Sequence, residues 1–218
     1  MFSIKTGEND SFFYYTSNFL DESLKNELEK FLETSKFHGG KCLSGKDIPR
    51  RQLWFQRQNG YFCNLWKYKY PRWESNEYSE VLDKIEKYTQ TKINEILAKN
   101  NITPPNLNSI LINKYRDGAD SIRPHRDSPI SFGETPIIIV ISIGASRDLL
   151  FKKVKYNNNI DSSNKIDNKN PQEFAFKMEN NSLFIMGGGS QRYFTHEIPK
   201  CDCKNTRYSL TLREYLEH

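Results

Sequence analysis

Residues 207–213 read RYSLTLR, a run in which every second side chain is polar or charged. In a β-strand, residues i and i+2 face the same side. Arg207, Ser209, Thr211 and Arg213 therefore share one face, and the three residues between them take the other. Burying two guanidinium groups on one strand face is costly unless anions meet them. The stretch predicts a strand whose polar face meets an anion.

Two metal-ligand motifs accompany this strand. Residues 125–127 read His-Arg-Asp, and His196 follows later in a chain that has only four histidines. If the first motif is extended, His125 and Asp127 point to one side and can reach a single ion. Two histidines and one carboxylate are the ligands of the facial triad that binds non-heme Fe(II) and leaves metal positions open. The pattern indicates an iron site.

A second group of polar residues has matching parity. Asn113 and Tyr115 share a face at the end of another predicted strand, and with Arg207 and Arg213 they could converge on one dicarboxylate. Each feature also has a plainer interpretation, since H-x-D occurs by chance, a single histidine is usually structural, and arginines form surface ion pairs. The combination in this order is more specific than any of its parts.

Composition limits the class of protein. The chain has 218 residues, with 36% hydrophobic and 27% charged residues, as in an ordinary globular domain. Its net charge of +5 fits either simple solubility or a polyanionic partner such as nucleic acid. We expect a single domain over 1–218 that acts as a monomer, with no obligate protein partner.

Cysteine usage and hydropathy indicate the compartment. Cys201 and Cys203 form one C-x-C, and Cys42 and Cys63 stand alone, so a zinc site lacks a clear second pair. Reduced thiols suit an intracellular protein. The first ten residues contain no apolar signal core, and no long apolar run follows. We expect an intracellular location, cytoplasmic or nuclear, without a membrane partner.

The residues before and after position 105 differ in their sequence pattern. Up to residue 105, a strand over 11–15 is followed by two helical apolar stripes, and Pro104-Pro105 ends the second. From 106 to 218, short β-rich runs alternate with turns, and a polar tract at 157–170 reads as an exposed hairpin insertion. This predicts a helical and loop-rich cover on a β sandwich or barrel. We predict strands near Ser109–Tyr115, Pro136–Ile143, Leu149–Val154, Glu173–Met178, Ser182–Met186 and Arg207–Arg213.

Together these motifs resemble the nucleic-acid repair branch of the AlkB family of Fe(II)- and 2-oxoglutarate-dependent dioxygenases. RYSLTLR is similar to that family's R-x-N-L-T-F-R signature, and Asn113-Lys114-Tyr115 is similar to its N-x-Y co-substrate motif. The resemblance covers about residues 45–213. It implies a mainly β fold with flanking helices, in which a double-stranded β-helix (jelly-roll) core carries an N-terminal helical and loop substrate-recognition extension.

The resemblance also implies roles for individual residues. It assigns iron to His125, Asp127 and His196, and the co-substrate to Asn113, Tyr115, Arg207, Ser209 and Arg213. Arg207 would bind the distal carboxylate of 2-oxoglutarate, which suits a bidentate arginine–carboxylate pair, and Arg213 would lie near the metal-end carboxylate. Ser209 stands where many members have asparagine; it can still form a hydrogen bond but is shorter.

The segment 48–62 resembles the start of the nucleotide-recognition lid in the same family. Arg50 and Arg51 would meet the nucleic acid backbone, within a region rich in basic residues between 41 and 69. A modified base must leave its stack to reach an iron pocket. Tyr61 is the first candidate for stacking on that base and Phe62 the second. Phe37 would act as an apolar wedge in the duplex, although packing at a helix end explains it as easily.

The predicted function is oxidative demethylation of N1-methyladenine and N3-methylcytosine in DNA, with RNA left open. The reaction would use Fe(II), 2-oxoglutarate and O2 and release formaldehyde, as direct-reversal alkylation repair. Two alternatives remain. The first is a 2-oxoglutarate dioxygenase that acts on another RNA modification or on a protein side chain. The second is a non-catalytic nucleic-acid-binding relative.

Overall fold

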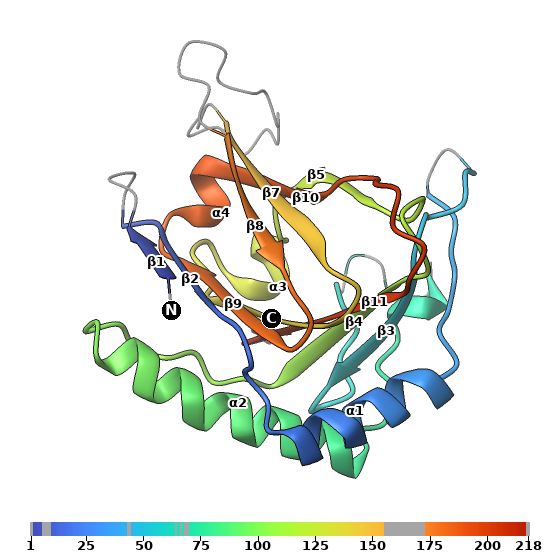
Figure 1. Cartoon of the computed structure of the whole chain (residues 1–218), viewed down its shortest axis with the longest axis horizontal. Helices are drawn as coiled ribbons and strands as arrows, with labels where there is room; N and C mark the ends of the chain where they lie inside the picture. Colours follow the sequence, from blue (N-terminus) through green and yellow to red (C-terminus); the bar gives the residue numbers. More distant parts are fainter. Residues whose placement is uncertain are drawn as a thin grey trace.

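The computed structural model describes residues 2–5, 10–42, 45–63, 65, 67, 70–154 and 173–216. Within them, two antiparallel sheets face each other, and two long helices cover the outer face of the larger sheet (Figure 1). The predicted insertion at 157–170 lies outside the described residues. The larger sheet has the order β1 (Phe2–Lys5), β2 (Phe12–Thr16), β9 (Ser182–Gly187), β6 (Ile138–Gly144), β11 (Arg207–Arg213), β4 (Ser109–Tyr115) and β3 (Arg51–Gln56). The smaller sheet has the order β5 (Ile122–His125), β10 (Phe194–Ile198), β7 (Arg147–Lys153) and β8 (Glu173–Met178).

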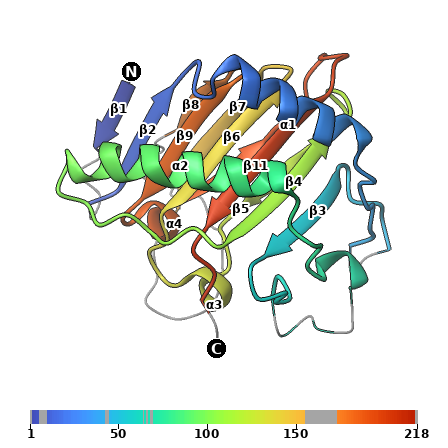
Figure 2. The ribbon, with the colours of Figure 1, turned by 90° about the horizontal axis from the view of Figure 1, so that it is seen from below.

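The helices form where their apolar stripes predict them. Asp21 caps α1 (Glu22–Thr34) by accepting a hydrogen bond from the backbone N–H of Leu24, and Ser79 caps α2 (Glu80–Ala98). Both helices bury their leucines and isoleucines against the larger sheet (Figure 2), and each such side chain contributes about 1.5–3 kcal/mol. The remaining helices are short: η2 (Pro71–Trp73), α3 (Pro129–Phe132) and α4 (Ser190–Tyr193). Among the described residues, none of the helices has the length and apolarity needed to cross a membrane.

The side chains of β11 alternate between the two faces of the larger sheet, as the sequence pattern predicts. Tyr208, Leu210 and Leu212 join the core under the helices. The residues between them line a cavity between the two sheets: Arg207, Ser209, Thr211 and Arg213. Because β11 pairs with β4 on one side and β6 on the other, all seven of its residues are buried.

The N-terminal part contributes more strand than the sequence predicts. We expected residues 1–105 to be a helical and loop-rich cover with one strand at 11–15; that strand is β2, but β1 and β3 also belong to the larger sheet. The run at 51–56 becomes a strand because it pairs with β4, with Leu53 opposite Ile112, and such a long-range partner is not visible in a local pattern. The division at residue 105 is therefore not a boundary between structural layers.

The predicted strands have the predicted bounds at 109–115, 173–178 and 207–213, and the other predicted strands lie within two residues of their expected ends. We did not predict β5 or β10. Both are short and polar, and β5 contains Pro124, which cannot donate to a β ladder. Its position at the edge of the smaller sheet makes the proline tolerable.

Candidate active site

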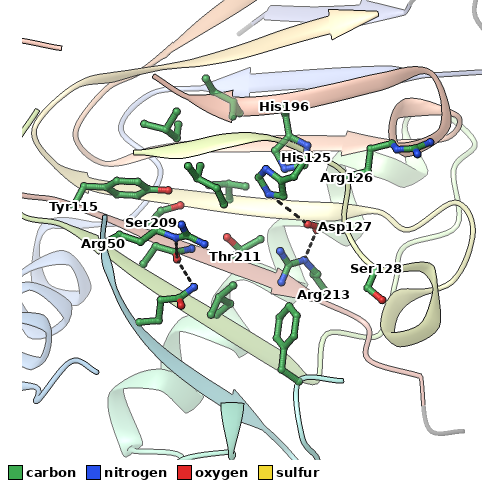
Figure 3. Close-up of a pocket in the computed structure, with 18 of the residues that line it drawn as sticks. Arg50, Tyr115, His125, Arg126, Asp127, Ser128, His196, Ser209, Thr211 and Arg213 are labelled. Carbon is green, nitrogen blue, oxygen red and sulfur yellow. Dashed lines mark hydrogen bonds and ion pairs between the residues drawn. The ribbon is translucent and has the colours of Figure 1, made fainter. Parts of the chain in front are cut away.

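The three predicted metal ligands lie together at one end of the smaller sheet. Strands β5 and β10 are antiparallel, with His125 directly opposite His196, and Asp127 follows two residues after β5. One ligand atom of each side chain lies within 4.8 Å of those of the other two, and the imidazole centroids are 4.3 Å apart (Figure 3). The register of two neighbouring strands thus brings together residues 71 positions apart in the chain.

Neighbouring groups fix the orientation of these ligands. His125 Nδ1 lies 2.9 Å from the carbonyl oxygen of Arg123, so its Nε2 points toward Asp127 Oδ1, 4.0 Å away. The backbone N–H of Asp127 donates to Gln191 Oε1 at 2.8 Å. Arg213 Nε forms an ion pair with Asp127 Oδ2 at 2.8 Å. His125 and Asp127 are therefore positioned before a metal arrives, which reduces the cost of binding.

The electrostatics suit metal binding. Burial lowers the pKa of both imidazoles, and that of His196 falls to about 3. Burial alone would raise the pKa of Asp127, but the charge of Arg213, which also forms a hydrogen bond with the carboxylate, outweighs burial and lowers the pKa. Neutral imidazoles and an ionised carboxylate are the protonation states in which these groups bind metals.

The buried polar atoms of the triad fit a metal ion. His196 Nδ1 is buried and forms no hydrogen bond with any described residue, and the only charged partner of Asp127 among the described residues besides the two imidazoles is Arg213. Buried polar atoms without a partner cost about 1–3 kcal/mol each, more when charged. Two imidazoles and one carboxylate on one side of an open cavity match the ligand set of a non-heme Fe(II) centre.

A cavity of about 400 Å³ extends from the triad toward the far end of β11. At that far end, Arg207 is 1% exposed, and its Nε donates to Ser142 Oγ at 2.8 Å. Its Nη1 is buried and has no hydrogen-bond partner among the described residues. Burial lowers the pKa of Arg207 to about 10. A buried cation without a carboxylate partner fits the distal carboxylate of 2-oxoglutarate.

The other predicted co-substrate residues surround the same cavity. Tyr115 and Ser209 line it, as does Asn113. Asn113 Oδ1 accepts hydrogen bonds from Arg50 Nε and Gln52 Nε2, both at 3.0 Å, which leaves the amide nitrogen of Asn113 as a donor. Five side chains that the family pattern assigns to the co-substrate thus share one cavity with the triad: Asn113, Tyr115, Arg207, Ser209 and Arg213.

The predicted substrate residues are more scattered. Arg50 and Phe62 line the cavity, whereas Arg51 is exposed at the start of β3. Tyr61 is buried in the adjoining aromatic cluster, where its hydroxyl donates to Glu74 Oε1 at 2.8 Å, and it does not line the cavity. Phe37 packs on the helix side of the larger sheet, with its ring centroid 5.7 Å from that of Tyr208.

The positions of Tyr61, Phe62 and Phe37 in the fold therefore change which of them is the best candidate to contact the substrate base. Phe62 stacks on Trp73 with ring centroids 4.4 Å apart, and both rings line the cavity. We ranked Tyr61 first, but Tyr61 does not line the cavity, so Phe62 becomes the better candidate. The wedge role of Phe37 gains no support, because Phe37 lies across the sheet from the cavity and fills a hydrophobic gap instead.

Sequence reasoning missed three residues at this site. Gln52 supports Asn113, Gln191 holds the backbone of Asp127, and Trp73 lines the cavity beside Phe62. Once 51–56 is assigned as a strand that pairs with β4, Gln52 lies opposite Asn113 and faces the same side as the cavity residues. The sequence could therefore have identified it. Gln191 and Trp73 lie in α4 and η2, whose single turns carry no periodic pattern.

Comparisons with known proteins agree with this geometry. A family model of the 2OG-Fe(II) oxygenase superfamily matches residues 12–213. DNA oxidative demethylase ALKBH2 of Arabidopsis thaliana is 31% identical over 118 residues, and alpha-ketoglutarate-dependent dioxygenase alkB homolog 3 of Mus musculus is 34% identical over 112 residues. These matches cover 49% and 51% of this chain, but only 37% of each relative.

Solved structures share the fold. The structure of OsALKBH1 aligns over 92% of this chain and 97% of its own, with a TM-score of 0.60 and 15% identity. A prolyl hydroxylase from Trichoplax adhaerens, solved with a hypoxia-inducible factor peptide, aligns over 93% of this chain and 83% of its own, with a TM-score of 0.55 and 13% identity. At such identities the likeness concerns the jelly-roll fold alone. On the family match, the chain belongs to the 2OG-Fe(II) oxygenase superfamily, and over about half of its length it is similar to the two AlkB-type relatives.

Proposed function

We propose that this protein is an Fe(II)- and 2-oxoglutarate-dependent demethylase of N1-methyladenine and N3-methylcytosine in DNA, with RNA as a further candidate. One observation carries the proposal. A His-Asp-His cluster lies in the same cavity as Arg207, a buried cation that has no carboxylate partner among the described residues. Such a site suits a metal and an acidic co-substrate together.

Each residue of the site would have a separate role in the proposed reaction. When bound, Fe(II) and 2-oxoglutarate activate O2 for oxidation of an N-methyl group, which leaves as formaldehyde while succinate and CO2 form. His125, Asp127 and His196 would hold the metal. Arg207 would bind the distal carboxylate, and Arg213 would keep Asp127 ionised and oriented. The buried walls of the cavity exclude bulk water from the reacting groups.

Aromatic and basic residues around the cavity support a nucleobase substrate. Phe62 and Trp73 offer a flat apolar wall, and stacking on an aromatic side chain contributes about 1–3 kcal/mol per base. Arg50 lies at the same cavity, and Arg51 and Arg72 are on nearby segments. An extruded methylated base is partly cationic and loses less pairing energy than an intact one when it leaves the stack.

The curated relatives support the same substrate class. Two carry names that describe oxidation by an alkB-type enzyme, and one of these names specifies DNA demethylation. Since the matches span less than half of those proteins, substrate choice in this chain is a matter for experiment. The alternatives are another RNA modification or a protein side chain as the oxidised group, or binding of nucleic acid without turnover.

A substrate panel tests the proposal. Single- and double-stranded DNA and RNA oligonucleotides, each with one N1-methyladenine or N3-methylcytosine, are incubated with the protein, Fe(II) and 2-oxoglutarate and analysed by mass spectrometry. We expect loss of one methyl group with one succinate formed per methyl removed, and neither product with His196→Ala. Binding of every oligonucleotide without methyl loss would support the non-catalytic alternative. Succinate formation with no change in any oligonucleotide would support a different substrate.

A further inference from the structure

Arg147, the first residue of β7, is a buried cation that the reaction scheme above does not use. It is 4% exposed. Its guanidinium donates to three backbone carbonyl oxygens: Asp117 at 3.0 Å, Asp120 at 2.9 Å and Pro199 at 2.5 Å. Within the part of the chain that the structure describes, it forms no ion pair with a carboxylate. Its hydrogen bonds are satisfied, but its charge is not neutralised by an acidic side chain.

The three carbonyl groups belong to the segments that flank the metal ligands. Asp117 and Asp120 lie in the loop between β4 and β5, and β5 ends at His125. Pro199 directly follows β10, which carries His196. Arg147 therefore joins the chain entering one ligand strand to the chain leaving the other.

The two loops also contact each other directly. Gly118 N–H donates to the carbonyl of Cys203 at 2.6 Å, and Cys201 N–H donates to the carbonyl of Gly118 at 3.0 Å. A Cβ atom at Gly118 would lie 1.9 Å from the carbonyl oxygen of Cys201, so this approach requires glycine. The junction is closely packed, and Arg147 lies at its inner side, next to the cavity residue Tyr115.

The position of Arg147 relative to Tyr115 connects it with the co-substrate end of the cavity. The guanidinium carbon of Arg147 lies 5.6 Å from the centroid of the Tyr115 ring, and that of Arg207 lies 5.3 Å from the same centroid. Two buried cations thus flank one aromatic ring whose hydroxyl group lies at the cavity. Like charges in a poorly solvated site repel each other, and a carboxylate bound there offsets the repulsion.

We propose that Arg147 is a positioning residue for the dicarboxylate co-substrate. It fixes Tyr115 and the loop before β5, and it adds a second positive charge where Arg207 meets the distal carboxylate. The site therefore selects 2-oxo acids that carry a second carboxylate. This inference rests on the proposed use of 2-oxoglutarate, and it gives the selectivity for that co-substrate a source beyond Arg207.

Binding to the Mn(II)-loaded protein tests this without turnover. Isothermal titration calorimetry measures the Kd of 2-oxoglutarate and of 2-oxopentanoate, which has the same carbon chain without the distal carboxylate. For Arg147→Gln we expect the Kd of 2-oxoglutarate to rise about tenfold, a typical size for one charge interaction in a partly buried site, and that of 2-oxopentanoate to stay within twofold. In steady-state assays, the KM for 2-oxoglutarate should rise while kcat is retained.

Two further variants separate charge from packing. Arg147→Lys keeps the charge but loses carbonyl bonds, so it should fold less stably and still discriminate between the two acids as the wild type does. Arg116→Gln is the matched control. It removes an arginine of the same loop, whose side chain bonds the Asp120 carboxylate at 2.7 Å and does not line the cavity. We expect it to leave both Kd values within twofold.

Three results would overturn the inference: equal rises in both Kd values for Arg147→Gln, no rise in either, or loss of discrimination in Arg147→Lys. The lysine variant decides the question if the glutamine variant does not fold. A wild-type protein that fails to bind 2-oxoglutarate would instead contradict the proposed function itself. The two failures are therefore distinguishable.

Discussion

Replacing Arg207 with methionine should make the protein more stable and less able to bind 2-oxoglutarate. The guanidinium is 1% exposed, and no described carboxylate pairs with it. Methionine fills a similar elongated space without a charge. A residue retained at a cost to stability is expected where binding needs it.

The pKa gives the size of the effect. Burial lowers the pKa of Arg207 well below the ordinary value of arginine, to about 10, and at about 1.4 kcal/mol per pKa unit this corresponds to about 3 kcal/mol against the charged form. The variant loses the hydrogen bond to Ser142, which contributes about 1–2 kcal/mol. The free energy of unfolding of Arg207→Met should therefore rise by roughly 1–2 kcal/mol, and Tm by roughly 2–8 °C for a chain of this size.

Urea unfolding with and without 2-oxoglutarate measures both effects on Mn(II)-loaded protein. At a concentration of one hundred times the wild-type Kd, 2-oxoglutarate should stabilise the wild type by about 2.7 kcal/mol. Loss of the charge pair should weaken binding at least about thirtyfold, so the variant should gain less than about 1 kcal/mol. Arg147→Met is the control. It should be destabilised, because three backbone carbonyl groups lose their donor.

A lower free energy of unfolding for Arg207→Met in the absence of 2-oxoglutarate would mean that its charge is compensated in the folded protein. Full stabilisation of the variant by 2-oxoglutarate would place the distal carboxylate elsewhere. Either result would refute the assignment of Arg207 as the co-substrate arginine.

Two further predictions concern the substrate and pH. Phe62→Leu should weaken binding of a methylated oligonucleotide about five- to thirtyfold through lost stacking, measured by fluorescence anisotropy, whereas Tyr61→Leu should leave it within twofold; the reverse order would return Tyr61 to first place. Asp120 is buried, which alone would raise its pKa, but hydrogen bonds and charge from Arg116 outweigh this and lower it. A carboxyl group whose pKa is lower in the folded state stabilises the fold at pH values above its unfolded pKa of about 3.9. This stabilisation is lost as the pH falls through the folded-state pKa. Asp120→Asn should thus cost about 1.5–3 kcal/mol at pH 7 in urea unfolding, with the difference from wild type shrinking below about pH 4; an equal difference at all pH values would exclude a charged Asp120.

Local patterns predicted the parts of the fold that local chemistry decides. The alternation in RYSLTLR gave both faces of β11, because the strand is central and one of its sides is apolar. The helical stripes gave α1 and α2. Strands β5 and β10 were not predicted. They are short, and they become strands through the pairing of β5 with β10 and of β10 with β7 rather than through a sequence pattern of their own.

In the site, too, local sequence patterns predicted some residues, and others depend on contacts between distant elements. The triad could be predicted because histidine is rare in this chain and the combination of two histidines with a carboxylate is chemically specific. The supporting groups could not, since Gln191 and Trp73 owe their roles to a fold that brings single-turn helices to the cavity. For Phe37 the sequence left both a wedge role and packing at a helix end open, and the structure shows the packing, against the core under the helices.

Anaerobic titration with Fe(II) and 2-oxoglutarate tests whether the triad and Arg207 form one binding site. The visible charge-transfer absorption of a chelated Fe(II)–2-oxo acid complex requires both components in one site. We predict one equivalent of Fe(II) per chain and a band that appears only when both are present. We also predict that the band is lost in Asp127→Ala and shifted to much higher 2-oxoglutarate concentration in Arg207→Met. A wild-type protein that binds no Fe(II), or a band that survives in Asp127→Ala, would contradict such a site.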